Sequence, residues 1–278
     1  MKKTLMAIMY DFDKTLSSDY MQNFGFIPEL GITPAEFWSM TNEFAEKADS
    51  DRTLAYMFMM IQKAKEKGIH LTKEKLHEYG KNIKFFKGVL TWFSRINAYG
   101  ESRGVKVEHY IISSGNKEII DGCPIAKEFK KVFGCEFVYD LKTKEAIWPK
   151  ICINFTQKTQ YFFRVSKGTF KTADEVKVNQ KNEKRRIQYR NMVYLGDGMT
   201  DIPAMILAHN NGGKSIALYS REQDKNEVVK LVHEDRVNFV AKADYSASSE
   251  LEKYMQLIID EISIRELINR KADMITKE

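Results

Sequence analysis

Leu5-Met6-Ala7-Ile8-Met9-Tyr10-Asp11-Phe12-Asp13-Lys14-Thr15-Leu16 is the stretch that decides the fold of this chain. Its first six residues are apolar or aromatic without interruption, which is typical of a strand buried on both faces of a sheet. Two carboxylates follow, at Asp11 and Asp13. Because ligands bind at the ends of the strands in open parallel sheets, we expect these two acids at the mouth of a functional site.

The rest of the chain alternates strands and helices, which predicts an α/β fold: a Rossmann-like, doubly wound parallel sheet. Strong strands at residues 107–112 and 191–195 end in Ser113-Ser114-Gly115-Asn116 and in Gly196-Asp197-Gly198-Met199-Thr200-Asp201. Shorter strands are predicted at 215–219 and 237–240, and a hairpin at 136–139 and 146–148. Helices are predicted at 89–99 (ending at Gly100), from Pro124 to about Phe133, at 156–167, after Asp201 to about His209, and at 249–270.

Between the first strand and residue 88 the pattern is helical. Thr33-Pro34-Ala35-Glu36 combines a capping box with a proline at the first helical position, and Thr72 is a further N-cap candidate. Apolar residues at helical spacing from Arg52 onward end at Gly68, a typical residue after a helix. The sequence therefore predicts a helical cap domain at residues 17–87 and an α/β core domain made of residues 1–16 and 88–278.

Composition excludes several classes of protein. With 44 basic and 38 acidic residues, the net charge of +6 is too small to indicate nucleic-acid binding by itself. Residues 167–190 hold eight Lys or Arg against three Asp or Glu, and a solvated loop at 168–190 is favoured over a binding patch. No apolar run is long enough for a membrane span, and the three cysteines have no metal-like spacing. A cytoplasmic protein with reduced thiols is expected.

The chemistry is expected where three strands end. Their polar clusters are Asp11 with Asp13, Ser113 with Ser114, and Asp197 with Asp201. Each cluster alone is common in loops and turns. Strand ends meet along one edge of a doubly wound sheet, however, so their joint occurrence in this order indicates one shared site.

These motifs resemble the first, second and fourth signatures of the haloacid dehalogenase superfamily in its phosphatase form, and the helical insert is similar to that superfamily's helical cap. The phosphoserine phosphatase-like branch is the most similar. The resemblance implies a Mg²⁺-dependent phosphomonoesterase that acts on a small phosphorylated metabolite through an aspartyl-phosphate, with the cap closing over the substrate. The acid two residues after the nucleophile favours phosphate transfer over dehalogenation, which needs no leaving-group acid.

The resemblance also implies roles for individual residues. Asp11 would be the nucleophile, and Asp13 would protonate the leaving oxygen and then activate water. A hard cation such as Mg²⁺ would offset the repulsion between carboxylate and phosphate. Its ligands would come from Asp11, Asp13 (through the backbone carbonyl), Asp197 and Asp201. Ser113 would bind the phosphoryl oxygens, with Ser114, Gly115 and Thr15 in the surrounding phosphate-binding loops.

A lysine should balance these charges, and two are candidates. Lys158 opens a predicted helix, as the superfamily's lysine does, and is preferred; Lys167, next to Gly168, is the alternative. Asp19 and Tyr20 stand near the place where the phosphoserine branch carries a glutamate for the substrate amine, which argues against phosphoserine itself. Arg52 is either a ligand for a carboxylate or second phosphate, or an ordinary surface residue.

Three other functions stay open at this point. The same site could transfer phosphate to an acceptor other than water. A protein that binds nucleic acid or processes its ends could use the basic segment 167–190. A non-catalytic binding module is the third, although the complete set of acids argues against it. The sequence predicts neither the substrate nor the oligomeric state.

Overall fold

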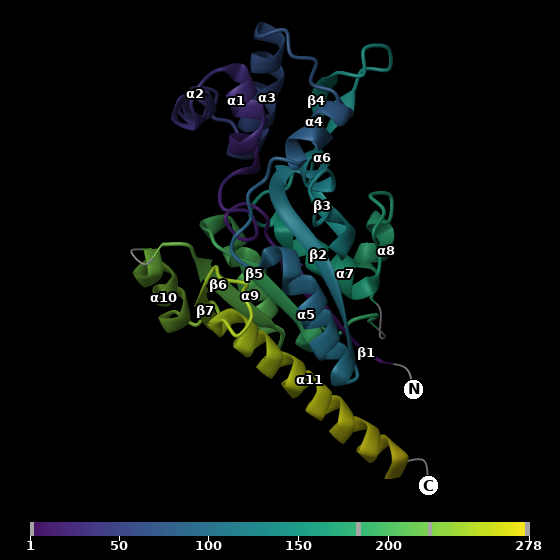
Figure 1. The fold of residues 1–278 in the computed structure, drawn as a ribbon. Helices are drawn as coiled ribbons and strands as arrows, with labels where there is room; N and C mark the ends of the chain where they lie inside the picture. Colours follow the sequence, from purple (N-terminus) through teal and green to yellow (C-terminus); the bar gives the residue numbers. More distant parts are fainter. Residues whose placement is uncertain (1–2, 182–184, 222–223, 276–278) are drawn as a thin grey trace.

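The structure, a computed structural model, describes residues 3–181, 185–221 and 224–275. Its centre is a seven-stranded sheet in the order β4-β3-β2-β1-β5-β6-β7 (Figure 1). Neighbouring strands are parallel, except that β3 and β4 are antiparallel. This confirms the predicted Rossmann-like α/β class. The strands are β1 (Thr4–Tyr10), β2 (Val105–Asn116), β3 (Phe129–Tyr139), β4 (Ala146–Ile151), β5 (Met192–Gly196), β6 (Lys214–Tyr219) and β7 (Phe239–Lys242).

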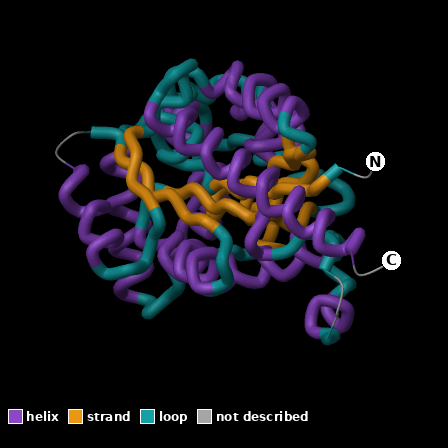
Figure 2. Tube along the Cα trace, turned by 90° about the horizontal axis from the view of Figure 1, so that it is seen from below, coloured by secondary structure: helices purple, strands orange, loops and turns teal. Residues whose placement is uncertain are grey.

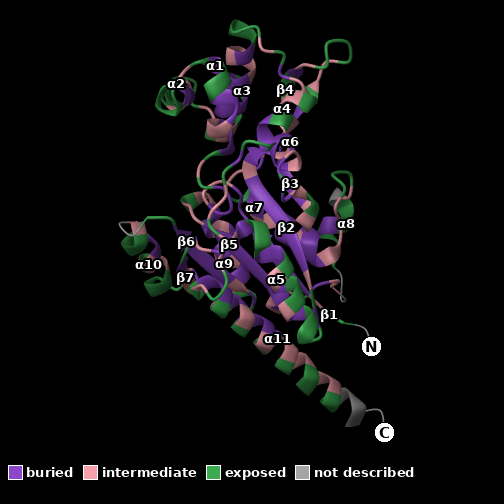
Figure 3. Ribbon diagram, viewed as in Figure 1, coloured by how far each residue is buried: buried purple, intermediate pink, exposed green. Residues whose placement is uncertain are grey.

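Helices cover both faces of the sheet (Figure 2), and the strands between them are the most buried part of the chain (Figure 3). In β1 the residues from Met6 to Tyr10 are fully buried, as the apolar run predicts. No helix of the described residues combines the length and the apolar character that crossing a bilayer needs. The helices of the sheet-forming part are α5 (Val89–Ser102), α6 (Lys117–Asp121), α7 (Gln157–Lys167), α8 (Glu175–Asn179), α9 (Ile202–Asn210), α10 (Lys225–His233) and α11 (Glu250–Ile275).

Residues 17–87, all of which the structure describes, form helices and no strand. The chain enters and leaves this helical insert through two segments that pair with each other: Ser18 N–H donates to the Lys84 carbonyl (2.8 Å), and Phe86 N–H to that of Leu16 (3.0 Å). In Figure 1 the insert lies beyond one end of the sheet. Its helices are α1 (Phe26–Leu30), α2 (Pro34–Lys47), α3 (Arg52–Glu66) and α4 (Lys73–Gly80).

Local signals predicted the insert helices well. The Thr33 side chain accepts from Glu36 N–H, Glu36 caps Thr33 in return, and α2 begins at Pro34, as predicted. Thr72 likewise caps α4 by accepting from Lys75 N–H. Each of these caps joins residues only three positions apart, so it does not depend on the rest of the fold.

Two predictions outside the insert are wrong. The helix expected from Pro124 to Phe133 is a 3₁₀ turn followed by β3, which begins at Phe129 and pairs in parallel with β2. A partner strand distant in sequence decides this segment. The helix expected to end at Gly100 continues to Ser102 and stops before Gly104, which has the left-handed φ of +72° that favours glycine. Helix α10 was not predicted.

Candidate active site

The carboxyl ends of β1 and β5 place two acids side by side. Tyr10, the last residue of β1, pairs with Ile111 of β2 and with Leu195 of β5. Asp11 follows directly, and its N–H donates to the Leu195 carbonyl (2.9 Å). Asp197 comes just after β5. The parallel register therefore delivers side chains almost 190 positions apart to one edge of the sheet.

Lys158, in the first turn of α7, lies between two of the acids. Its Nζ is 3.0 Å from Asp11 Oδ1 and 2.6 Å from Asp201 Oδ1, and the lysine is fully buried. Burial lowers the pKa of this ammonium, but the two carboxylates outweigh it and raise the pKa. Lys167, the alternative lysine, is at the other end of α7 and donates to two backbone carbonyls in and after α8. The structure thus brings Lys158, and not Lys167, to the acids.

Asp201 is fully buried and held from three sides. Besides Lys158, its Oδ1 accepts from the Tyr194 hydroxyl (2.7 Å), and its Oδ2 accepts from Gly198 N–H (3.2 Å). Gly196 leaves room for this carboxylate, because a Cβ there would lie 2.5 Å from Asp201 Cγ. Sequence reasoning missed Tyr194. The available signal was a tyrosine within a buried strand, since a buried hydroxyl needs a partner.

Three carboxylates form a compact group: ligand oxygens of Asp11, Asp197 and Asp201 lie within 4.8 Å of one another. Burial, followed by the charge of Asp201, raises the pKa of Asp11 to about 6. Burial, then Asp201 and Asp11, raises the pKa of Asp197 to about 8. Lys158 alone cannot balance three such groups. A set of crowded, hard oxygen donors fits a divalent cation of the Mg²⁺ type.

Asp13 belongs to a different part of the site. Its Oδ1 accepts from Met21 N–H (2.8 Å), so the side chain faces the start of the insert. Burial and then the charge of Asp11 raise its pKa. Gly115 packs against it, because a Cβ there would lie 3.0 Å from Asp13 Oδ2 and 2.0 Å from Met21 Cε. The two acids of the first motif therefore point to different neighbours.

The second strand end supplies hydroxyl groups. Ser113 is buried, and its Oγ accepts from the backbone N–H two residues later (3.0 Å), which leaves its own proton to donate. The Ser114 carbonyl accepts from the Tyr56 hydroxyl of α3 (2.7 Å), while Ser114 Oγ is buried without a partner among the described residues. Thr15 Oγ1 donates to Asp197 Oδ1 (3.3 Å), so Thr15 ties the first motif to the fourth.

No protein-family model matches this chain. An uncharacterised protein of Borreliella burgdorferi is 28% identical to it in an alignment 278 positions long, which covers 90% of this chain and 95% of that protein. This likeness extends over nearly the whole length of both chains.

Solved structures share the fold at low sequence identity. A phosphoserine phosphatase with bound substrate has a TM-score of 0.54 at 13% identity, over 92% of this chain and 99% of that one. A probable phosphoserine phosphatase from Vibrio cholerae has a TM-score of 0.57 at 12% identity, over 95% and 67%. A HAD-family hydrolase from Salmonella enterica serovar Typhi has a TM-score of 0.52 at 16% identity; 80% of this chain spans 64% of that structure. This chain has the haloacid dehalogenase (HAD) superfamily fold.

Within this HAD fold, a cavity of about 300 Å³ lies between the strand ends and the helical insert. We call it the insert pocket. Asp13, Ser114 and Gly115 line its sheet side, so it opens onto the acid that stands apart from the carboxylate group. The insert side is lined by Tyr20, Gln22, Trp38, Thr41, Asn42, Arg52, Thr53 and Tyr56.

The insert side of this pocket was only partly foreseen. The sequence favours a small core for the Met and aromatic residues of the insert, and Phe37, Met57 and Met60 are indeed fully buried. Trp38 and Tyr56 instead line the pocket. A helical signal existed for α3, because residues four apart, such as Arg52 and Tyr56, share one helix face.

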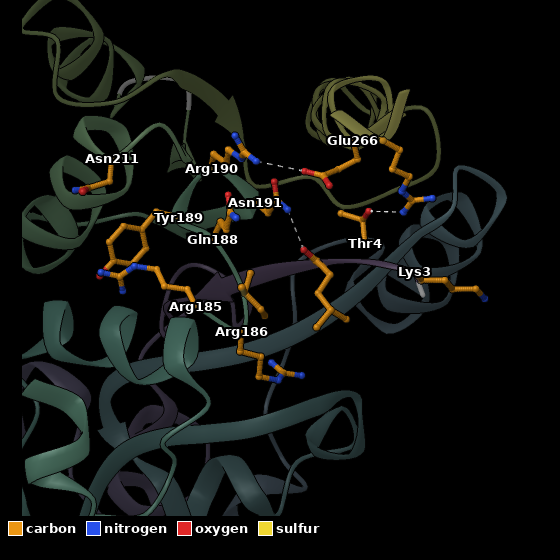
Figure 4. A pocket seen from close by; sticks show the side chains of 13 residues that line it. Lys3, Thr4, Arg185, Arg186, Gln188, Tyr189, Arg190, Asn191, Asn211 and Glu266 are labelled. Atoms are coloured by element: carbon orange, nitrogen blue, oxygen red, sulfur yellow. Dashed lines mark hydrogen bonds and ion pairs between the residues drawn. The ribbon is translucent and has the colours of Figure 1, made fainter. Parts of the chain in front are cut away.

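The basic segment lines a second cavity, of about 890 Å³ (Figure 4). This cavity lies beside Thr4, at the amino end of β1, whereas Asp11 follows the carboxyl end. The seven residues of β1 separate the two by about 23 Å at roughly 3.3 Å per residue. Several of its cations are already paired, for example Arg186 with Glu108 (2.5 Å). Residues 182–184 of the segment lie outside the described residues.

Proposed function

We propose that this chain is a Mg²⁺-dependent phosphomonoesterase for a small phosphorylated metabolite. The observation that carries the proposal is the buried Lys158 between Asp11 and Asp201, 3.0 and 2.6 Å away, beside a third carboxylate at Asp197. A lysine and three carboxylates at the end of a central strand suit phosphoryl transfer, where charge must be balanced around a phosphate. The HAD fold supports this assignment.

Asp11 is the proposed nucleophile. Its carboxylate attacks phosphorus, the bond from phosphorus to the ester oxygen breaks, and an aspartyl-phosphate forms. Asp13 gives its proton to the departing oxygen, a role supported by its place at the mouth of the insert pocket. Asp13 then takes a proton from water, which attacks the same phosphorus and releases Asp11 and inorganic phosphate.

The other residues bind and orient. Lys158 holds the Asp11 carboxylate in place and stabilises the charge of the phosphoryl group, to which Ser113 donates its hydroxyl proton. Asp11 and Asp197 would hold Mg²⁺, which would supply positive charge against the phosphate oxygens. Both oxygens of Asp201 already accept hydrogen bonds. Asp201 would therefore orient Lys158, and it would add negative charge next to the metal site.

The helical insert at residues 17–87 is the proposed cap over a core of residues 1–16 and 88–278. The insert pocket would seat the leaving group. The basic cavity, about 23 Å away by strand length, is too distant to present a phosphate to Asp11. Processing of nucleic-acid ends through the basic segment is therefore the weaker proposal.

The test is a Mg²⁺-dependent screen of phosphometabolites and aryl phosphates, with the release of inorganic phosphate as the readout. We expect Asp11→Asn to lose turnover and the acid-stable phosphate label on the protein, because the nucleophile is gone. Asp235→Asn, at an exposed aspartate outside the site, is the matched control. Adding candidate acceptor alcohols separates hydrolysis from transfer. Mg²⁺-dependent hydrolysis that survives Asp11→Asn would refute the mechanism.

A further inference from the structure

The insert pocket has an aromatic wall. The Trp38 ring contacts those of Tyr20 and Tyr56, at centroid distances of 5.0 and 6.1 Å and at angles of 50° and 64° to them. The polar ends of two of these rings are occupied elsewhere: Trp38 Nε1–H donates to Asn23 Oδ1 (3.0 Å), and the Tyr56 hydroxyl to the Ser114 carbonyl (2.7 Å). The rings are therefore held in place, and a ligand meets their carbon surfaces. Such a wall suits the flat face of a ring.

The charge of the pocket is unequal along its length. Its acidic and basic lining residues are Asp13, at the reaction end, and Arg52, at the insert end. Arg52 is exposed, and no described residue forms an ion pair with it. An acidic group on the leaving group would therefore find a free guanidinium across the pocket from the reacting phosphate.

An ammonium group would find no carboxylate at the insert end. Asp19, the acid nearest to the first motif, does not line the pocket. Its oxygens accept from Tyr20 N–H (2.9 Å) and from Asn23 Nδ2 (2.8 Å), which fixes the turn that follows. A substrate amine would be desolvated beside Arg52 without a counter-charge, and this costs binding energy.

The aromatic wall is also unsuited to a cationic ligand. Rings can bind a cation over their faces, but Lys14 Nζ already lies 3.9 Å from the centroid of the Tyr20 ring. Arg52 also lines the pocket, so a cationic ligand would be repelled by both Lys14 and Arg52. The wall is thus best matched to a ring without positive charge.

Gln22 adds a hydrogen-bonding group to this wall. The residue is 1% exposed, and its Nε2 donates to Asn116 Oδ1 (3.0 Å). Its Oε1 is buried and has no partner among the described residues, although Gln22 lines the pocket. An unsatisfied buried acceptor is costly, so a ligand hydroxyl or ring N–H that donates to it would be favoured.

From these contacts we infer the class of substrate, on the basis of the proposed phosphatase function: a phosphomonoester of a small alcohol with one planar ring and an acidic substituent, and without an amine. The ring packs against the Trp38 side chain, the acidic group reaches Arg52, and the ester oxygen lies at Asp13. A cavity of about 300 Å³ is at the small end of ligand pockets, which span roughly 300–1,000 Å³, and this suits a small substrate with one ring.

Three probes test this inference: 4-carboxyphenyl phosphate, 4-(aminomethyl)phenyl phosphate and O-phosphoserine. We expect kcat/KM for the carboxylate to exceed that for the ammonium by about tenfold or more, because a charge-assisted hydrogen bond replaces a repulsion. O-phosphoserine, which has an amine and no ring, should be the poorest of the three. The purified full chain with Mg²⁺ is used throughout.

Variants assign the preference to the pocket. Arg52→Met should bring the ratio of the two aryl kcat/KM values close to one, while Arg236→Met, at a partly exposed arginine outside the pocket, should keep it. Trp38→Leu should lower kcat/KM for both aryl phosphates relative to O-phosphoserine. Tyr20→Leu, at a more exposed ring of the same wall, provides the same comparison if Trp38→Leu does not fold.

The outcomes separate this inference from the proposed function. Hydrolysis with equal or reversed preference, or with O-phosphoserine as the best probe, overturns the substrate class and leaves the phosphatase in place. If no probe is hydrolysed, the phosphatase proposal fails. Calorimetric binding of the two aryl phosphates then tests the ligand preference inferred for the insert pocket. Tighter, Arg52-dependent binding of the carboxylate supports the inference, and equal binding overturns it.

Discussion

His109 shows how a single buried side chain connects the sheet to its covering helix. The Trp92 indole N–H donates to the Tyr10 hydroxyl (2.9 Å), which leaves the Tyr10 proton for His109 Nδ1 (3.0 Å). His109 Nε2 therefore carries the ring proton and donates it to Asn97 Oδ1 (3.0 Å). Burial lowers the pKa of His109 to about 3. The network, one residue before Asp11, requires the neutral imidazole.

This requirement predicts a pH dependence of stability. The folded pKa of His109, about 3, lies below the ordinary 6.5, so the unfolded chain takes up a proton first as the pH falls. The stabilisation is complete above about pH 6.5 and is lost as the pH falls toward 3. Between about pH 7.5 and about pH 5, the free energy of unfolding should fall by about 2 kcal/mol more in the wild type than in His109→Gln.

Urea unfolding at a series of pH values measures this difference. Comparing the two proteins removes the contribution of all other titrating groups that they share. Parallel curves for wild type and His109→Gln would show that the folded protein protonates His109 as readily as the unfolded chain does, contrary to its buried contacts.

Which residues could be read from the sequence depends on where their partners lie. Asp11 and Asp197 were predictable because each follows a strand whose end must lie at the sheet edge. Tyr194 and Trp38 were not, because their importance comes from Asp201 and from the insert pocket, which only the folded chain assembles. Arg52 could be read either way, since a charge at the start of a helix is ordinary by itself.

Helix α7 decides a question that its sequence leaves open. Lys158 and Lys167 stand at its two ends. Lys158 is buried between two acids, while Lys167 donates to carbonyls of the basic segment. The two lysines thus contact the carboxylate group and the backbone of α8 and its following residue, respectively.

We expect Lys158→Met to lower kcat for aryl phosphate hydrolysis by about a hundred- to a thousandfold, because it removes a preorganised charge next to the phosphoryl group. Lys167→Met is the matched control on the same helix, and we expect it to change the melting temperature more than kcat. Steady-state kinetics and thermal melting of both variants provide the comparison. A larger loss of kcat in Lys167→Met would transfer the role to that lysine.

Elements were predictable where their signals are local. The caps at Thr33 and Thr72 mark α2 and α4 within one turn. The first part of β3, from Phe129, was missed, whereas its end was predicted as the hairpin strand at 136–139. The apolar residues of the first part suit helix or strand alike, and only pairing with β2 decides between them.

At the scale of the whole molecule, the packing of the sheet and the insert brings several carboxylates close together, and their charges repel one another. The sheet buries Asp11 and Asp201, and the insert covers the approach to Asp13. Three carboxylate groups within 4.8 Å, with one lysine, destabilise the folded state by mutual repulsion. A cation bound at this point joins the ends of β1 and β5 and should therefore stabilise the fold as well as the reaction.

This predicts that Mg²⁺ raises the melting temperature of the purified protein above its value in EDTA. At a free concentration of about one hundred times Kd, the gain is about 2.7 kcal/mol, or roughly 5–10 °C for a chain of this size. Asp197→Asn should lose most of that rise, because it removes a ligand. In EDTA the same variant should melt no lower than wild type, since one repelling charge is gone. Asp235→Asn, outside the site, should keep the full rise. An equal rise in Asp197→Asn and wild type would place the bound cation elsewhere.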